Sequence, residues 1–176
     1  RQLHALAHNR DPRPVRPRRR RRSIGAQRAL GRRARTPAEI QAALMTLVDR
    51  VARRLRAAHR ACRTIILRLR FDDYNRATRS RTLAEATTRT ATILSVARGL
   101  LLAAGALIAK RGLTLIGVAV TNLCDDGAIQ LALPFDRSAG LDRAVDTVRE
   151  RFGSGAIARG ALVGSDPGPW VPLLPD

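Results

Sequence analysis

The stretch Thr64-Ile65-Ile66-Leu67-Arg68-Leu69-Arg70-Phe71 alternates between two kinds of side chain. Side chains of a β-strand point to opposite sides of the sheet in turn, so every second residue shares a face. One face of this strand carries Ile65, Leu67, Leu69 and Phe71, and the other carries Thr64, Ile66, Arg68 and Arg70. The stretch therefore predicts a strand with one buried side and one cationic side.

A hairpin is predicted immediately after this strand. The four residues Asp72-Asp73-Tyr74-Asn75 are typical of a turn. The β-branched and small polar residues of 76–83 then favour a second strand, antiparallel to the first. We expect the two strands to form a hairpin that carries many arginines.

Two amphipathic helices flank the hairpin in the sequence. Thr36-Pro37-Ala38-Glu39 is a strong helix start, with a capping Thr, a Pro at the first position and a Glu at the third. The apolar stripe of this helix, which should run to about His59, is Ile40, Leu44, Leu47, Val51 and Leu55. A second helix is predicted to open at Thr87-Thr88, with the stripe Ile93, Val96, Leu100, Leu101, Ala104 and Leu107.

Two further strands complete the predicted domain. Residues 23–30 give a weakly signalled first strand, and residues 113–123 give a strand that is apolar on both faces and therefore central. The order strand, helix, strand, strand, helix, strand is the split β-α-β-β-α-β arrangement of an α+β fold. It predicts a four-stranded antiparallel sheet with two helices on one face. The open face would then present Arg68, Arg70, Arg79 and Arg81, with Arg76 near the turn.

The charge of this 176-residue chain is unevenly distributed. The formal net charge is +12 over residues 1–35, +10 over 36–123 and −3 over 124–176. A strongly basic region favours a polyanionic partner, with nucleic acid first and a membrane surface second. No apolar run approaches the roughly 18 residues that span a bilayer, and no signal peptide is visible, so we expect a cytoplasmic protein that does not enter a membrane.

The cysteines and histidines give no sign of a metal site. Cys62 and Cys124 form no CxxC pair and are expected to be buried thiols. His4 and His8 have the i,i+4 spacing of a helix face, but no third ligand is nearby.

A short apolar segment follows the predicted last strand. Gln130-Leu131-Ala132-Leu133-Pro134-Phe135 is too short for a core element, and its Pro cannot donate to a strand ladder. It comes directly after Cys124-Asp125-Asp126-Gly127, which we expect to end the strand. The segment is typical of a tether that presents apolar anchors to another molecule. Beyond it, residues 141–152 predict an amphipathic helix with Leu141, Val145 and Val148 on one stripe.

These motifs, in this order, resemble a known family. The hairpin sequence, the Ser23-Ile24-Gly25 opening, Ile116-Gly117-Val118 in the last strand and Asp11-Pro12-Arg13-Pro14-Val15 upstream resemble the little finger of the Y-family translesion DNA polymerases. The similarity is greatest to the bacterial DNA polymerase IV branch, in an actinobacterial form. It implies the end of a thumb helix at 1–10, a basic linker at 11–22, the little finger at 23–123, a clamp-binding segment at 124–136, a C-terminal helix and extension at 137–164 and a disordered tail at 165–176.

The resemblance also implies partners and roles for individual residues. Primer–template DNA would be bound through its phosphates by Ser23, Gly25, Arg68, Arg70, Arg76, Arg79 and Arg81. The sliding β-clamp would be bound by Gln130, Leu131, Leu133, Pro134 and Phe135. Such contacts position DNA without reading its sequence.

Catalysis is not expected in these residues. A polymerase holds two metal ions with clustered carboxylates, whereas the acidic residues here are scattered. The resemblance therefore implies a DNA-directed DNA polymerase whose magnesium-binding palm precedes Arg1, and a chain that itself holds no cofactor or metal and is inactive.

Two alternative functions remain open. A basic α+β RNA-binding module of ribosomal or RNA-maturation type explains the charge and the fold but not the apolar segment, and the sheet lacks the aromatic residues on which an RNA-recognition motif stacks bases. A domain that binds acidic lipids leaves the hairpin arginines unexplained.

Overall fold

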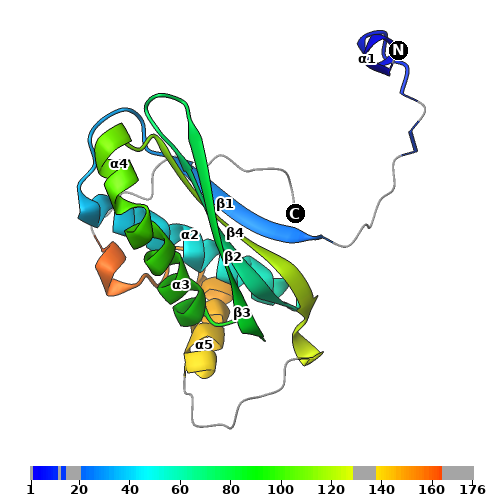
Figure 1. Cartoon of the computed structure of the whole chain (residues 1–176). Helices are drawn as coiled ribbons and strands as arrows, with labels where there is room; N and C mark the ends of the chain where they lie inside the picture. The colour runs from blue at the N-terminus through cyan, green and yellow to red at the C-terminus, as the bar shows by residue number, and fades with distance from the viewer. Residues whose placement is uncertain (1, 12, 15–20, 129–137, 164–176) are drawn as a thin grey trace.

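The computed structural model describes residues 2–11, 13–14, 21–128 and 138–163 (Figure 1). The helices are α1 (Gln2–Ala7), α2 (Pro37–Ala57), α3 (Thr90–Ala103), α4 (Gly105–Arg111) and α5 (Ser138–Phe152). The strands are β1 (Ser23–Ala29), β2 (Arg60–Arg70), β3 (Arg76–Thr87) and β4 (Leu115–Asp125). Two single-turn 3-10 helices, η1 (Asp126–Ala128) and η2 (Gly160–Leu162), follow β4 and α5.

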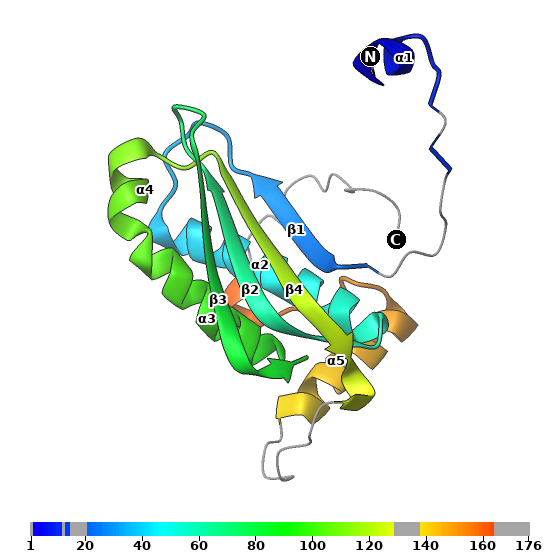
Figure 2. The same cartoon turned by 45° about the vertical axis from the view of Figure 1, so that its right-hand side comes forward.

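The strands form one antiparallel sheet in the order β1-β4-β2-β3. Helices α2 and α3 lie behind this sheet in the view of Figure 2, so that its front face is left open. The predicted α+β fold, with β4 central and two helices on one face, is confirmed.

The buried face of β2 forms the centre of the core. Ile65, Leu67 and Leu69 are almost fully buried, as predicted from the alternation. Leu44 and Val51 of α2 belong to the same buried cluster. Burial of a side chain of this size stabilises a fold by about 1.5–3 kcal/mol, so this row holds α2 and the sheet together.

The start of α2 is fixed by a reciprocal cap. The Glu39 backbone N–H donates to Thr36 Oγ1 at 3.2 Å, and the Thr36 backbone N–H donates to Glu39 Oε2 at 2.8 Å. The second bond holds the pKa of the Glu39 carboxyl below its usual range. The sequence predicted this start correctly.

The second helix differs from the prediction in its start and its straightness. β3 continues through Thr87, and α3 begins only at Thr90. The helical segment then breaks at Ala104, and α4, which begins at Gly105, turns away by 54°. Of the predicted stripe, Val96, Leu100 and Leu107 are only half-buried, whereas Leu94 and Ala97, which were not part of it, are buried.

No single helix among the described residues is long and apolar enough to cross a bilayer. Helices α3 and α4 together meet the length and composition, but they are bent against each other, and α3 buries Ile93, Ala97 and Leu101 in the core.

The end of β4 also departs from the prediction. The strand continues through Asp125 instead of ending at 123, because Arg60 of β2 pairs with Asp125 in register and donates from Nη1 to Asp125 Oδ1 at 2.7 Å. Both cysteines are free thiols, with Cys62 buried and Cys124 half-buried. Burial raises the pKa of Cys62 to about 12, so that this thiol stays protonated.

Thr36→Ala removes one half of the cap and should lower the free energy of unfolding by about 1 kcal/mol, because a backbone N–H in the first turn of α2 loses its acceptor. Urea unfolding followed by circular dichroism measures this loss. Thr36→Ser keeps the acceptor and should unfold like the unmodified chain. An equal loss in both variants would show that the cap hydroxyl does not stabilise α2.

Candidate nucleic-acid interface

The register of the sheet decides which side chains lie on its open face. Residues directly opposite each other in neighbouring strands point to the same side. Arg68 lies opposite Gly117 and Thr78, and Arg70 lies opposite Arg76. Since Leu67 and Leu69 point into the core, Arg68, Arg70 and Arg76 point away from the helices, as predicted.

Arg79 and Arg81 do not lie on this face, so the prediction for them was wrong. Arg79 is opposite Leu67, and Arg81 is opposite Ile65, which places both arginines on the helix side of the sheet. They are nevertheless exposed, because β3 is an edge strand. With polar residues on both faces of β3, its sequence has no apolar alternation that would have set the phase.

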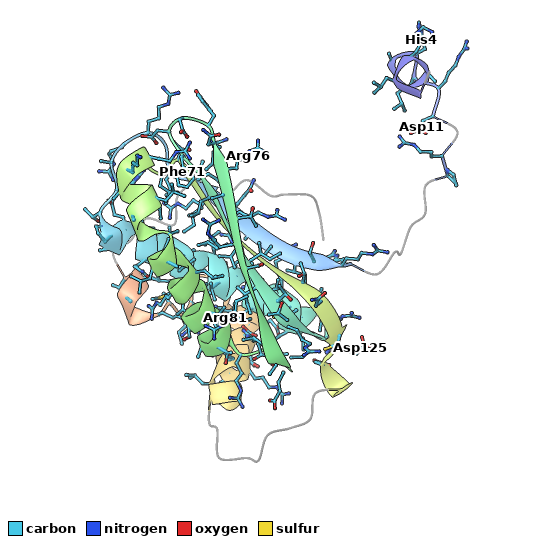
Figure 3. All side chains as sticks on the ribbon, viewed as in Figure 1. His4, Asp11, Phe71, Arg76, Arg81 and Asp125 are labelled. Atoms are coloured by element: carbon cyan, nitrogen blue, oxygen red, sulfur yellow. The ribbon has the colours of Figure 1, made fainter. Side chains whose placement is uncertain are left out.

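Arginines therefore flank β3 on both sides. Figure 3 shows Arg76 near the hairpin end of the strand and Arg81 further along it. Arg68, Arg76 and Arg81 make no ion pair with any residue that the structure describes. Arg79 donates only to the carbonyl of Thr78, at 3.2 Å, and Arg70 Nε to Thr114 Oγ1, at 3.3 Å.

Hydroxyl-bearing residues and Gln27 lie beside these arginines on the open face. The cross-strand pairs place these side chains there: Ser23, Gln27, Thr64, Thr78, Ser80, Thr82 and Thr121. Thr64 Oγ1 lies 2.9 Å from Thr82 Oγ1 and accepts from Asn122 Nδ2 at 2.9 Å. The sequence analysis missed this row of hydroxyls, although Thr64 and Thr82 were both in the predicted hairpin.

The two glycines of the open face lie where a side chain would crowd the neighbouring strand. A Cβ at Gly25 would lie 3.1 Å from the Cβ of Ala119, and one at Gly117 would lie 3.1 Å from the Cβ of Gln27. Gly25 also accepts a hydrogen bond from Arg54 Nη1 of α2 at 3.0 Å, which ties β1 to the helix layer. Ser23 is exposed at the start of β1, as predicted.

The carboxylate of Asp73 in the hairpin turn is paired with an arginine that lies outside the predicted set. In the hairpin turn, Arg111 Nε donates to Asp73 Oδ2 at 2.8 Å. This bond, with a further one from Asn75, holds the pKa of Asp73 below its usual range. Asp73 therefore stays charged and paired, and the arginines of β3 keep their positive charge available for another molecule.

The predicted clamp-binding residues Gln130 to Phe135 lie outside the described residues, but both flanks are described. On the first side, Arg60 pairs with Asp125, and the backbone N–H of Asp126 donates to the carbonyl of His59 at 3.1 Å. On the second side begins α5, which docks on α2 at the back of the domain (Figure 2). The described residues on either side of this segment, Asp126 and α5, are thus both bound to the rest of the domain.

Helix α5 docks through charged side chains, and of the predicted apolar stripe Val145 and Val148 are half-buried while Leu141 is exposed. Leu141 is 61% exposed, whereas Asp142 and Arg149 are buried. In the sequence this charged row has the spacing i, i+4, i+7, which is ordinarily typical of a solvent-exposed face. Its burial is matched by Arg56 and Asp49 of the facing helix α2 and by Arg159 before η2, which pair with these side chains.

An ionic clasp joins α5 and η2 to α2, and it consists of three aspartates and three arginines: Asp49, Asp142, Asp146, Arg56, Arg149 and Arg159. Arg56 binds Asp146 with two bonds, at 2.6 and 3.1 Å. Arg149 Nη1 donates to Asp49 Oδ2 at 2.6 Å. The backbone N–H of Thr90 donates to Asp142 at 2.8 Å, which connects α5 to the start of α3.

Comparison with known proteins identifies the family. The model of the impB/mucB/samB family C-terminal domain matches residues 21–133, well over half of the chain. The chain belongs to this family.

The relatives of this C-terminal domain carry polymerase names. The chain is 37% identical over 177 residues to DNA polymerase IV 2 of Mesorhizobium japonicum, a match that covers 91% of the chain and 42% of the relative. It is 34% identical over 161 residues to DNA polymerase IV of Caulobacter vibrioides, covering 90% of the chain and 39% of that relative. The chain thus spans about two fifths of the length of these relatives.

Two solved structures of DNA polymerases contain a part with the same fold as this chain. A Y-family DNA polymerase chimera superposes with a TM-score of 0.52 at 19% identity, covering 70% of the chain and 35% of the chimera. Dbh DNA polymerase in a post-insertion binary complex superposes with a TM-score of 0.51 at 16% identity, with the same coverage. The little-finger fold expected from the sequence is therefore confirmed.

Arg56→Ala should release α5 from the C-terminal domain, because it removes the cation that Asp142 and Asp146 share. Removing one partner of a fully buried ion pair costs about 3–5 kcal/mol. A loss of only about 1.4 kcal/mol is enough to make opening of the clasp tenfold more frequent. Limited chymotrypsin digestion with mass spectrometry should then show cleavage after Leu141 and Phe152 at least about tenfold faster.

Arg53→Ala is the matched control, since Arg53 lies one turn away on α2 and makes no ion pair within the described ranges. Unchanged cleavage in Arg56→Ala, or an equal increase in both variants, would contradict the clasp.

Proposed function

We propose that this chain binds primer–template DNA along the edge strand β3. The observation that carries the proposal is that arginines project from both faces of this strand without a carboxylate partner among the described residues. A phosphate backbone that follows the edge would meet Arg68, Arg70 and Arg76 on one side and Arg79 and Arg81 on the other. Lys and Arg contacts to phosphates supply most of the affinity for nucleic acid and no sequence information.

The open face contributes weaker donors to the same partner. Hydroxyls of Ser23, Thr78 and Ser80 and the backbone near Gly25 can donate to phosphate oxygens. Because Gly25 and Gly117 carry no side chain, a duplex could approach the backbone of β1 and β4 closely at these positions. This interface suits an enzyme that moves along DNA, because none of its contacts depends on the base sequence.

A second partner, the sliding β-clamp, is proposed for residues 130–135. Gln130 would hydrogen-bond at the mouth of a groove on the clamp, while Leu131, Leu133 and Phe135 fill the groove and Pro134 keeps the segment extended. Apolar residues outside a core support this proposal, since they are otherwise a liability in solution.

The whole protein is proposed to be a translesion DNA polymerase of the cytoplasm. The polymerase names of the relatives and the family support this proposal. The described carboxylates of this chain do not fit a site for two magnesium ions: Asp73 binds Arg111, Asp125 binds Arg60, and Asp49, Asp142 and Asp146 belong to the ionic clasp. Nucleotidyl transfer would thus depend on other residues, and this chain would supply binding.

DNA binding should weaken steeply with salt. For each phosphate that is neutralised, log K falls by about 0.9 per unit of log salt concentration on duplex DNA. Arg76→Ala should lower this slope by about 0.9 and reduce affinity equally for unrelated sequences, as measured by fluorescence anisotropy with labelled primer–template DNA.

Arg98→Ala serves as the control, because Arg98 is exposed on α3, behind the sheet. An unchanged slope in Arg76→Ala would contradict the interface. Tighter binding to structured RNA than to primer–template DNA, measured at the same two salt concentrations, would instead favour an RNA-binding module.

Clamp binding should depend on two apolar side chains. Titration of the chain against a purified sliding clamp should show that Leu133→Ala and Phe135→Ala each weaken binding at least about tenfold, since truncating an apolar anchor in a well-packed pocket costs about 2 kcal/mol or more. Both variants should bind DNA like the unmodified chain. Clamp affinity that is unaffected by both substitutions would refute the role of this segment.

A further inference from the structure

The hairpin turn between β2 and β3 contains a tyrosine in an unfavourable backbone conformation. The Tyr74 N–H donates to the carbonyl of Phe71 at 3.0 Å, and the Phe71 N–H donates to the carbonyl of Asn75 at 2.9 Å. To close the turn, Tyr74 adopts a φ of +62°. Glycine or asparagine is favoured in this left-handed region, and a bulky side chain there is uncommon.

Packing into the core does not explain the choice of tyrosine. The residue is 68% exposed, although the whole chain contains only five aromatic residues. A large, exposed side chain on a residue with a strained backbone is unusual, because neither burial nor local backbone preference favours it. Such residues are concentrated at functional sites.

The ring is held in place by an arginine from a distant loop. The guanidinium of Arg32, in the connection between β1 and α2, lies 5.3 Å from the ring centroid. Arg32 Nη2 also donates a hydrogen bond to the Tyr74 hydroxyl. One side chain thus contacts both the ring and its polar end, and it orients the ring while leaving most of its surface in solvent.

The surroundings of the ring match those of a nucleic-acid contact. The last cross-strand pair before the turn is Arg70 with Arg76, both on the open face. Figure 3 shows Arg76 at the hairpin end of β3. Arg111 supports the base of the turn by binding Asp73 and by lying 5.2 Å from the Phe71 ring centroid. Tyr74 is therefore a rigidly mounted aromatic ring directly beyond a pair of phosphate-binding candidates.

We propose that Tyr74 packs its ring against a nucleotide of the DNA strand whose phosphates Arg70 and Arg76 bind, and that Arg32 is the positioning residue that orients the ring. The inference rests on the DNA binding proposed above. Aromatic rings stack on unpaired bases and pack on sugars irrespective of sequence, so this contact adds affinity without adding base specificity. It is also non-ionic, which separates it experimentally from the arginine contacts.

Tyr74→Gly in the full 176-residue chain separates the functional role from a structural one. Because glycine accepts the left-handed conformation without strain, the variant should melt at the same temperature as the unmodified chain or higher. Its affinity for primer–template DNA should nevertheless fall about fivefold or more, the lower end of what a base–aromatic stack contributes. The slope of log K against log salt should stay unchanged, in contrast to Arg76→Ala.

Further arms identify the contact. Tyr74→Phe keeps the ring and should retain most of the affinity. A loss in Tyr74→Gly that appears with an overhanging template but not with a blunt duplex assigns the ring to an unpaired base, and an equal loss with both assigns it to a sugar. Arg32→Gln should weaken DNA binding in the otherwise unmodified chain but not in the Tyr74→Gly variant. It should leave the slope of log K against log salt unchanged.

Three results would overturn the inference. Unchanged DNA affinity of Tyr74→Gly, with normal salt-dependent binding by the unmodified chain, would refute the ring contact but leave the proposed function intact. A lower melting temperature in both Tyr74→Gly and Tyr74→Asn would assign the ring to folding. A shallower salt slope in Arg32→Gln would show that Arg32 binds phosphate itself. Absence of salt-dependent DNA binding by the unmodified chain would instead contradict the proposed function.

Discussion

The structure depends on one row of buried side chains on the second strand of the sheet. Ile65, Leu67 and Leu69 pack under α2 and α3, and strict alternation then turns Arg68 and Arg70 to the other side. A single helix layer can cover only one face of a sheet. The open face is therefore a consequence of the way the core is built, and its charge is fixed by the residues that alternate with the core.

Arginines in this domain have two distinct uses. Arg56 of the helix layer and Arg149 of the C-terminal helix bind carboxylates in the ionic clasp. Those along β3 have no such partner among the described residues and are left for another molecule. Burying an ion pair gives little net stability compared with apolar packing, so the clasp gives α5 a defined docking position more than it gives the fold stability.

The sequence predicted most of the fold but only part of the site. Strong local signals, such as the alternation of 64–71 and the cap at Thr36, gave the correct elements and topology. Arg79 and Arg81 were assigned to the wrong face because β3 is polar on both sides and its phase is set by pairing with β2. The clasp and the contact between Arg32 and Tyr74 join residues far apart in the chain, and no local pattern signals them.

The most direct test of the central claim is a map of the contact surface in solution. Backbone amide NMR shifts should be recorded while primer–template DNA is added to the chain. The account predicts that the largest shift changes occur in β3, in the hairpin turn and in the residues of β1 and β2 on the open face, while the amides of α2 and α3 shift little. Changes centred on the helix layer, with β3 unaffected, would contradict it.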